Sequence, residues 1–362
     1  MIHIDFDSLE GIGLTAELCR RAQACNPTGG TGDVLFLARV CSAHRETVRL
    51  HDGHGERTSR PLPRLLRRLL DEETLLAVGD WVLASSGGEC WVHERVPPLN
   101  HIARRDGDGS RHPVVSNVDC ALLVMGLDDD FNLRRLERYL TLAYGSGVAP
   151  LVVLTKADVA AADPLLRDER LAALARRIPG RVPSLVVDAT APETAARFAP
   201  FTGAGQTLVV LGSSGAGKST LTNTLLGRAA QDTGAVREHD SRGMHTTTAR
   251  SLHRLPGGGC VIDTPGLRTL RPDVDEATLT ASFEDVGNFA AHCRFRDCRH
   301  GDEPGCAVRD GVDADRLRNY HKLLRDTQRE SMTWVERRQQ VSAWKSRGKA
   351  TRERMKLKRG DG

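Results

Sequence analysis

The pattern of apolar and polar positions divides the chain into three parts with different secondary structure. Between Asp33 and about Ile102 the apolar runs are short and are separated by turns containing Gly and Asp, as is typical of a small β-barrel or β-sandwich. The strands predicted in this part are Val34–Cys41, Thr47–Leu50, Trp81–Ala84 and Glu89–His93. Periodicity alone does not distinguish a barrel from a sandwich. The preceding residues, 1–32, form an N-terminal extension that ends in a Gly-rich linker.

From about Val114 the pattern changes to buried strands that alternate with amphipathic helices. The run Ala121–Met125 is apolar at every position, which is typical of a parallel strand covered on both faces. Asn132 is a good N-cap for the next helix, and Asp163 with Pro164 predicts the start of another. Further strands are predicted at Leu151–Leu154, Leu185–Val187, Thr207–Leu211 and Cys260–Ile262. This alternation predicts a doubly wound α/β sheet.

The third part, from about Arg271, is helical and polar and ends in a basic tail, 331–362. The net charge of the whole chain is only +4, so the Lys and Arg residues of the tail are a local concentration. Such a segment favours a polyanionic partner, most often nucleic acid, over a tail that only aids solubility.

The composition narrows the class of protein. Hydrophobic residues make up 40% of the chain and charged residues 27%, which is ordinary for a soluble globular protein and excludes disorder as the dominant state. The apolar runs fall far short of the ~20 residues that span a bilayer, and the N-terminus lacks the pattern of a secretory signal. We therefore expect a cytoplasmic protein without a membrane partner. The nine cysteines argue against a disulfide framework, and Cys120 and Cys260 are expected in the core.

A phosphate-binding loop is predicted at the end of the strand Thr207–Leu211. The segment matches G-x-x-x-x-G-K-[ST] and consists of Gly212, Ser213, Ser214, Gly215, Ala216, Gly217, Lys218 and Ser219, with Thr220 opening the next helix. Its glycines let backbone N–H groups surround the phosphates, and the helix N-terminus favours an anion. Lys218 is expected to reach the β- and γ-phosphates, and Ser219 to bind Mg²⁺.

Two further loops follow predicted strands and decide which nucleotide is bound. Asp263 and Gly266 form a D-x-x-G element, in which the carboxylate holds Mg²⁺ through water and the Gly N–H contacts the γ-phosphate. Thr155, Lys156, Ala157 and Asp158 resemble the N-K-x-D element of GTPases. Asp158 would accept from N1–H and the exocyclic amine of guanine, and Lys156 would lay its apolar stem on the base. Thr155 stands in place of the usual Asn, and its hydroxyl is expected to donate to N7.

The order of these elements indicates a circular permutation. Most GTPases carry the phosphate loop before the base-reading loop, whereas here Thr155–Asp158 precedes Gly212–Ser219. The site survives such a permutation because each loop follows the carboxyl end of a strand, and strand packing rather than chain order places it. As a consequence, Asp263 leads directly into the third part of the chain.

The chain resembles the ribosome small-subunit-dependent GTPase A family from about Asp33 to Leu324. The resemblance rests on the permuted order and on four motifs: Gly243–Thr248, Gly79–Val82, Ser116–Asp119 and Arg318–Tyr320. It implies an OB-fold at 33–103, a permuted P-loop GTPase domain at 112–275 and an α-helical zinc-binding domain at 276–330. It further implies ribosome-stimulated hydrolysis of GTP to GDP, binding to the small subunit and its rRNA, and a role in its late maturation.

A metal cluster is predicted in the third part. Cys293, Cys298, His300 and Cys306 offer three thiolates and one imidazole, which satisfies tetrahedral Zn²⁺ and leaves no open position. We therefore expect one structural zinc ion per chain. The surrounding segment has few apolar residues and could hardly fold without the metal.

The catalytic group is less obvious. In many GTPases a Gln follows the D-x-x-G element and orients the attacking water, but Leu267 occupies that place. We expect slow intrinsic hydrolysis that depends on Lys218, with His245 as the candidate polar group and Thr247 as a further Mg²⁺ contact. A structural or RNA-contacting role for His245 remains the alternative.

Two other functions remain open from the sequence. The chain could be an RNA-binding assembly factor that uses the nucleotide only as a conformational switch, or a P-loop ATPase or kinase. Asp158 argues against the last, because adenine lacks both donors that it would read. We expect a monomer.

Overall fold

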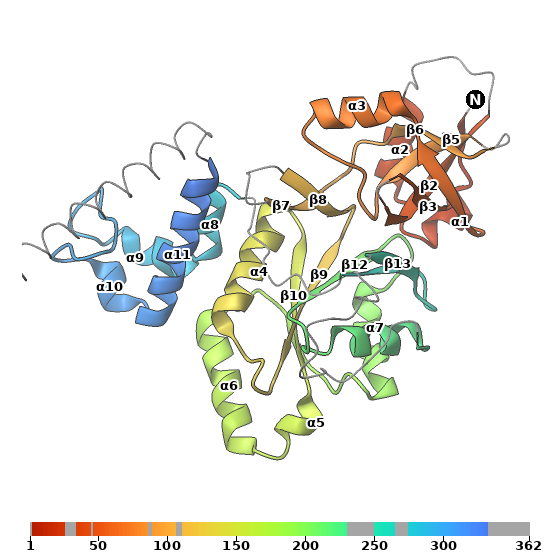
Figure 1. Ribbon diagram of the computed structural model, residues 1–362. Coiled ribbons are helices and arrows are strands. Elements are labelled where there is room, and N and C mark those ends of the chain that lie inside the picture. The colour runs from red at the N-terminus through yellow and green to blue at the C-terminus, as the bar shows by residue number, and fades with distance from the viewer. Residues whose placement is uncertain are drawn as a thin grey trace, which may run out of the picture.

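The barrel, the sheet and the helical module follow one another along the chain, as Figure 1 shows. The computed structural model describes residues 2–25, 34–44, 46–85, 89–105, 111–229, 250–264 and 274–331. Among these residues, none of the helices combines the length and the apolar character needed to cross a bilayer.

The first part is a closed five-stranded barrel of the OB type. Its strands are β2 (Leu35–Ala43), β3 (Val48–His51), β4 (Glu56–Pro61), β5 (Trp81–Ser85) and β6 (Trp91–Arg95), in the order β2-β3-β4-β6-β5. Pairing of β2 with β5 closes the barrel, and β4 runs parallel to β6. Helix α3 (Pro63–Asp71) buries Leu65 and Leu69 in the barrel core. The closure resolves the choice between barrel and sandwich.

The four strands predicted in this part are present within two residues, but β4 and α3 were not predicted. Five of the six positions of β4 are not buried, so the strand has no apolar alternation to reveal it and depends on its partners β3 and β6. The helix α3 did leave a signal, since Pro63 is followed by the i, i+4 pair Leu65 and Leu69.

The N-terminal residues are built into the fold. Strand β1 (Ile2–His3) pairs in parallel with β2, and α1 (Phe6–Glu10) and α2 (Ala16–Ala24) follow. Leu9, Ile12 and Leu18 are buried in one continuous core that also contains Trp81 of the barrel and Val209 of the central sheet. The extension therefore seals the contact between barrel and sheet. The Gly-rich linker lies outside the described residues.

A buried arginine marks the same contact. The guanidinium of Arg39, on β2, donates to the carbonyl oxygen of Ile12, to Thr207 Oγ1 at 2.8 Å and to the carbonyl oxygen of Asn117 at 2.9 Å. It also lies 5.4 Å from the centre of the Trp81 ring. Because Thr207 opens the strand that leads to the phosphate loop, this cation fixes the barrel to the base of that strand.

A hairpin, β7 (His101–Arg105) with β8 (Arg111–Ser116), connects the barrel to a six-stranded sheet. The strands are β9 (Cys120–Gly126), β10 (Ala149–Thr155), β11 (Ser184–Val186), β12 (Thr207–Gly212), β13 (Ser251–Arg254) and β14 (Cys260–Asp263). Their order is β11-β10-β9-β12-β14-β13, and all pair in parallel except β13 with β14. Cys120 and Cys260 are buried, as predicted.

Helices cover both faces of this sheet (Figure 1). On one face lie α4 (Leu133–Gly145) and α6 (Pro164–Arg177), and on the other α7 (Lys218–Leu226) and the 3₁₀ helix η1 (Pro192–Phe201). The predicted caps are confirmed, since Asn132 accepts a hydrogen bond from the N–H of Arg135 and Asp163 from that of Leu166, each at 3.0 Å. The short helix α5 (Ala157–Ala160) follows β10.

The helical module consists of α8 (Glu276–Ser282), α9 (Glu284–Ala290), α10 (Ala307–Gly311) and α11 (Ala314–Ser331). Its core is small and contains Leu279, Phe283, Val286 and Leu323, packed against the cysteines of the predicted metal cluster. The module lies beside α4. The residues of the basic tail beyond Ser331 lie outside the described part.

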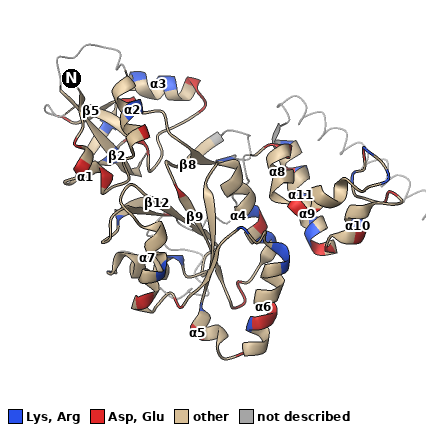
Figure 2. Cartoon of the chain, turned by 180° about the vertical axis from the view of Figure 1, so that it is seen from behind, with Lys and Arg blue, Asp and Glu red and all other residues tan. Residues whose placement is uncertain are grey.

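Buried charges join the module to the sheet. Glu137, on α4, is 2% exposed and accepts hydrogen bonds from Arg316 Nη1 at 2.7 Å and Asn319 Nδ2 at 2.6 Å. Arg316 also holds Asp285 with two bonds of 2.6 and 2.8 Å. Burial raises the pKa of Glu137, and Arg316 and Asn319 oppose that rise. Figure 2 shows a further basic region at the end of α6, where Arg177 reaches α11.

Replacing Arg316 by Met is expected to loosen this junction. The variant leaves Glu137 and Asp285 without their shared cation, and breaking a buried ion pair on one side costs about 3–5 kcal/mol. Amide hydrogen exchange should show that the free energy of local opening of α11 falls by this amount. Arg318→Met on the same helix removes only an exposed partner of Asp315. This variant should change the opening free energy of α11 by less than about 0.5 kcal/mol. Equal exchange in both variants would contradict a stabilising role for the network.

Candidate nucleotide-binding site and metal centre

The predicted phosphate loop has the expected strand–loop–helix setting. It runs from the end of β12 to the start of α7, with Gly215 and Gly217 in the left-handed region at φ of 83° and 85°. A Cβ on Gly212 would lie 2.4 Å from the carbonyl oxygen of Val124, so only glycine fits there. Lys218 Nζ donates to the carbonyl oxygen of Ser213 at 2.6 Å, which folds the ammonium group back over the loop. Ser213, Gly217, Ser219 and Thr220 are partly buried, Ser214 and Gly215 are exposed and Ala216 is buried.

Asp263 ends β14, the strand that pairs with β12, and it lies level with Val210 two residues before the phosphate loop. Asp263 is 7% exposed, and its Oδ1 has no hydrogen-bond partner among the described residues. Burial raises the pKa of Asp263, and the charges of Lys218 and His253 oppose this. A buried oxygen without a partner, next to a phosphate loop, fits a hydrated Mg²⁺ ion.

The loop after β10 contains the predicted base-reading residues. Lys156 has a left-handed backbone at φ 61°, and Asp158 is exposed in the first turn of α5. The N–H of Ala157 bonds to the carbonyl oxygen of Val187, which ties the loop to the residues after β11. There, Asp188 accepts hydrogen bonds from the N–H and hydroxyl groups of Thr190.

Thr155 makes a different contact from the expected one. Its side chain is fully buried, and Oγ1 donates to the carbonyl oxygen of Ala216 at 2.7 Å. The single hydroxyl hydrogen is therefore directed to the phosphate loop rather than towards a base N7. The contact also restrains Gly217, whose position would place a Cβ 3.2 Å from the same oxygen. In this structure Thr155 connects the two loops.

The structure brings these loops together in the way the permutation requires. Strands β10, β9, β12 and β14 are neighbours in that order and run parallel, so their carboxyl ends meet at one edge of the sheet. The remaining predicted residues, His245, Thr247 and Gly266, lie outside the described residues, as does Leu267. Their roles stay predictions.

One group at this edge was missed from the sequence. Asp128 and Asp130 follow β9 and contact both nucleotide loops, because Asp128 pairs with Lys156 and Asp130 accepts a hydrogen bond from Ser213. The run Asp128-Asp129-Asp130 directly after a buried strand was a visible signal. The contacts of this run follow from the position of β9 between β10 and β12, which the sequence does not show.

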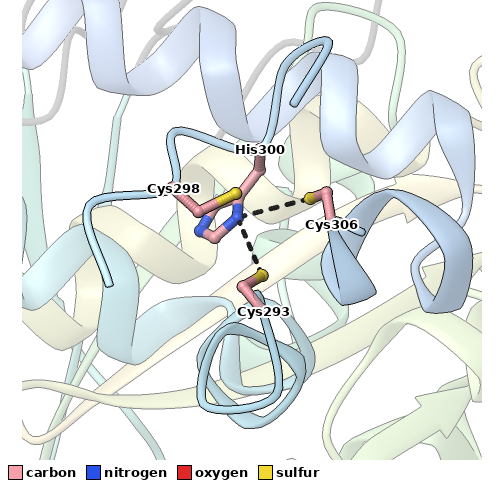
Figure 3. Close-up of side chains that lie close together, drawn as sticks. All are labelled: Cys293, Cys298, His300 and Cys306. Carbon is pink, nitrogen blue, oxygen red and sulfur yellow. Dashed lines mark hydrogen bonds between the residues drawn. The ribbon is translucent and has the colours of Figure 1, made fainter. Parts of the chain in front are cut away.

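The predicted metal ligands converge on one point. Figure 3 shows Cys293, Cys298, His300 and Cys306 around a common centre, and their ligand atoms all lie within 4.8 Å of one another. The distances from His300 Nδ1 to Sγ of Cys293 and of Cys306 are both 3.7 Å. Ligands of a tetrahedral zinc ion, with bonds of about 2.0–2.3 Å, lie about 3.3–3.8 Å apart, so these two distances fit a bound zinc ion.

Backbone contacts hold these four residues in place. Cys306 is the N-cap of α10, and its Sγ accepts from the N–H of Arg309 at 3.4 Å. His300 has a left-handed φ of 61°, and its carbonyl oxygen contacts His321 Nε2 on α11 at 3.1 Å. The N–H of Arg294 bonds to the carbonyl oxygen of Gly305, which closes the loop between the outer cysteines. Three thiols and one imidazole are the number of donors that a closed tetrahedral metal site requires.

Comparisons with known proteins identify the family. Residues 93–272 match the family described as RsgA GTPase. A protein named small ribosomal subunit biogenesis GTPase RsgA, from Xanthomonas axonopodis pv. citri (strain 306), is 44% identical over 294 residues, which is 79% of each chain. The protein of that name from Xanthomonas oryzae pv. oryzae (strain MAFF 311018) is 43% identical over the same share.

Two solved structures share the fold. YjeQ from Thermotoga maritima has a TM-score of 0.58 at 23% identity, covering 80% of this chain and 98% of its own. YloQ, described as a circularly permuted GTPase, has a TM-score of 0.56 at 21% identity, covering 83% of this chain and 97% of its own. The permuted arrangement predicted from the motif order is thus shared with a known fold.

Proposed function

Because the chain belongs to the RsgA GTPase family, we propose that it hydrolyses GTP to GDP and phosphate and acts in the biogenesis of the small ribosomal subunit. The observation that carries this proposal is the convergence of three loops on one sheet edge: the phosphate loop, the loop with Asp158 and the end of β14 with Asp263. In that order, these loops would bind the phosphates of one nucleotide, its base and the accompanying metal ion.

The residues around the phosphate loop would act by position and charge. Lys218 turns from the carbonyl oxygen of Ser213 to the β- and γ-phosphates, and the N–H groups of 213–220 surround them. Ser219 and Asp263, with Thr247, would hold Mg²⁺, which neutralises charge on the phosphates when bound. Gly266 would contact the γ-phosphate, and His245 would orient the attacking water.

The cluster of Cys293, Cys298, His300 and Cys306 would hold one structural Zn²⁺ ion. The barrel and the basic tail would contact rRNA, since closed barrels of this type bind oligonucleotides and a basic segment binds phosphates. Measuring phosphate release with and without purified small subunits tests the proposal. Acceleration by the subunits supports a regulated GTPase, whereas equal rates favour a factor that uses the nucleotide only as a switch.

Base selection provides the most direct test of the nucleotide assignment. Asp158→Asn would replace one of the two carboxylate oxygens expected to accept from guanine by an N–H donor. Leaving one guanine donor unpaired costs about 1–3 kcal/mol, or about 5- to 150-fold in affinity. The new amide N–H would suit the 2-oxo group of xanthine. We therefore expect titrations to show weaker GTP binding and tighter XTP binding.

Asp168→Asn, on the exposed face of α6, makes the same chemical change away from the loop and serves as the control. Its GTP and XTP affinities should equal those of the wild type. If Asp158→Asn also left both affinities unchanged, the loop would not read the base.

A further inference from the structure

The loop that follows β9 lies between the two nucleotide loops. Strand β9 pairs with β10 on one side and with β12 on the other, over Cys120–Gly126 and Cys120–Val124 respectively. Because all three strands run parallel, residues 127–132 leave the sheet between the loop with Lys156 and the loop with Ser213. No expected contact to GTP falls on this segment.

Asp128 reaches the base-reading side. Its Oδ2 lies 2.6 Å from Lys156 Nζ, and both side chains are about 70% covered. Burial is the largest single influence and acts to raise the pKa of Asp128, but the hydrogen bond and charge of Lys156 and the N–H of Asp130 together hold the pKa below its ordinary value. The approach needs Gly126, since a Cβ there would lie 2.3 Å from Asp128 Oδ1. The ammonium group of Lys156 is therefore anchored while its methylene stem stays free to lie along a base.

Asp130 reaches the phosphate side. Its Oδ1 accepts from Ser213 Oγ at 2.6 Å, and its Oδ2 accepts from the N–H of Gly126 at 3.2 Å. Arg135, in the first turn of α4, pairs with the same carboxylate at 2.6 Å. The negative charge of Asp130 is thus balanced by an arginine of the helix that follows the loop, so the loop contacts the phosphate loop without placing an unpaired charge beside it.

We propose that Asp128 and Asp130 are positioning residues that hold the base-reading loop and the phosphate loop at the spacing one guanine nucleotide requires. The inference rests on the proposed function. Asp128 fixes Lys156, Asp130 fixes Ser213, and Asp128 Oδ1 accepts from the N–H of Asp130 at 3.2 Å, so the two contacts share one rigid turn. The hydrogen bond from Thr155 to Ala216 is a further direct contact between the base-reading loop and the phosphate loop.

The contacts of Asp128 and Asp130 are expected to affect nucleotide binding rather than the hydrolysis step. Loops that are already at the correct spacing lose less conformational entropy when the ligand binds. The two carboxylates contact the nucleotide loops through Lys156 Nζ and the hydroxyl of Ser213, and neither group is assigned to the attacking water or to the transferred phosphoryl group. The interactions are therefore expected to contribute equally to ground state and transition state. Such uniform binding changes KM and Kd and leaves kcat unchanged.

The test compares three alanine variants of one loop: Asp128→Ala, Asp130→Ala and Asp129→Ala. Asp129 is exposed and carries the same charge, so it is the matched control. We expect the first two to weaken GTP and GDP binding by about threefold to tenfold, the worth of a partly buried charged contact, with kcat at saturating GTP unchanged. Asp129→Ala should bind as the wild type does. Nucleotide titration and steady-state hydrolysis give the two readings.

Ser213→Ala removes the donor of the hydrogen bond between Ser213 and Asp130. It therefore tests this contact even if Asp130→Ala folds poorly. If Asp130 acts through Ser213, the variant that combines Asp130→Ala with Ser213→Ala should bind GTP no more weakly than Asp130→Ala alone. Affinities of Asp128→Ala and Asp130→Ala equal to that of Asp129→Ala would overturn the proposal, as would additive losses in the double variant. Failure of the wild type to bind guanine nucleotides would instead overturn the proposed function.

Discussion

Replacing Lys218 by alanine is expected to abolish GTP hydrolysis, with or without small ribosomal subunits. The ammonium group of Lys218 contacts the carbonyl oxygen of Ser213 in the phosphate loop, and Lys218 is the first residue of α7, the helix that follows this loop. Removal of a positioned group that stabilises transition-state charge costs about a hundredfold to a thousandfold, and loss of a phosphate contact also weakens binding. Phosphate release at saturating GTP would then fall to background.

The control is Lys322→Ala, which removes an exposed lysine of α11, far from the loop in sequence. It should hydrolyse GTP at the wild-type rate. Thermal unfolding of both variants separates a catalytic loss from a folding defect. Hydrolysis that survives the Lys218 change, in a protein that still unfolds cooperatively, would assign the activity to another site.

The nucleotide loops could be predicted because their information is local. A phosphate loop needs glycines at fixed spacing, a Lys and a helix start, and all of these are consecutive in Gly212–Ser219. The contacts between loops were not predictable in the same way. Thr155 was expected to face a base, but burial and the nearby carbonyl oxygen of Ala216 direct its hydroxyl to the phosphate loop. The orientation of this hydroxyl therefore depends on a contact between two residues, Thr155 and Ala216, that are 61 positions apart in the chain.

The N-terminal part of the fold shows the same limit. Residues before the barrel were expected only as an extension, because nothing in Leu9, Ile12 or Leu18 alone shows which surface they cover. The structure places them against Trp81 in the core shared by barrel and sheet. Sequence patterns reveal that such residues are apolar, while the partner surface comes from a segment more than 60 residues away.

The junction of Glu137 with Arg316 was likewise invisible in the sequence. Both residues lie in helices rich in charge, and charged positions on helices are usually solvated. Their burial follows only from the docking of α11 on α4, 179 residues later in the chain. The metal ligands, in contrast, lie within one short segment, so their spacing was sufficient to predict the cluster.

Replacing Cys298 by serine is expected to remove the metal and unfold the segment between Cys293 and Cys306. Between these two residues the structure has turns but no helix or strand, and the core that the module offers is small. Metal binding contributes about 10–16 kcal/mol in small zinc modules, far more than the few apolar contacts here. Metal analysis of the purified variant should therefore show less than one zinc ion per chain, and hydrogen exchange should be fast across α9 and α10.

Cys90→Ser provides the control, because Cys90 is half-buried in the barrel and is not part of the cluster. It should retain its metal. The Cys298 variant should still bind GTP, since the phosphate loop, Asp158 and Asp263 all lie in the α/β part of the chain and not in the helical module. A wild-type protein that carries no stoichiometric metal under reducing conditions, yet protects α9 and α10 from exchange, would show that these helices are stable without zinc. The small core and the Arg316 network would then have to supply that stability themselves.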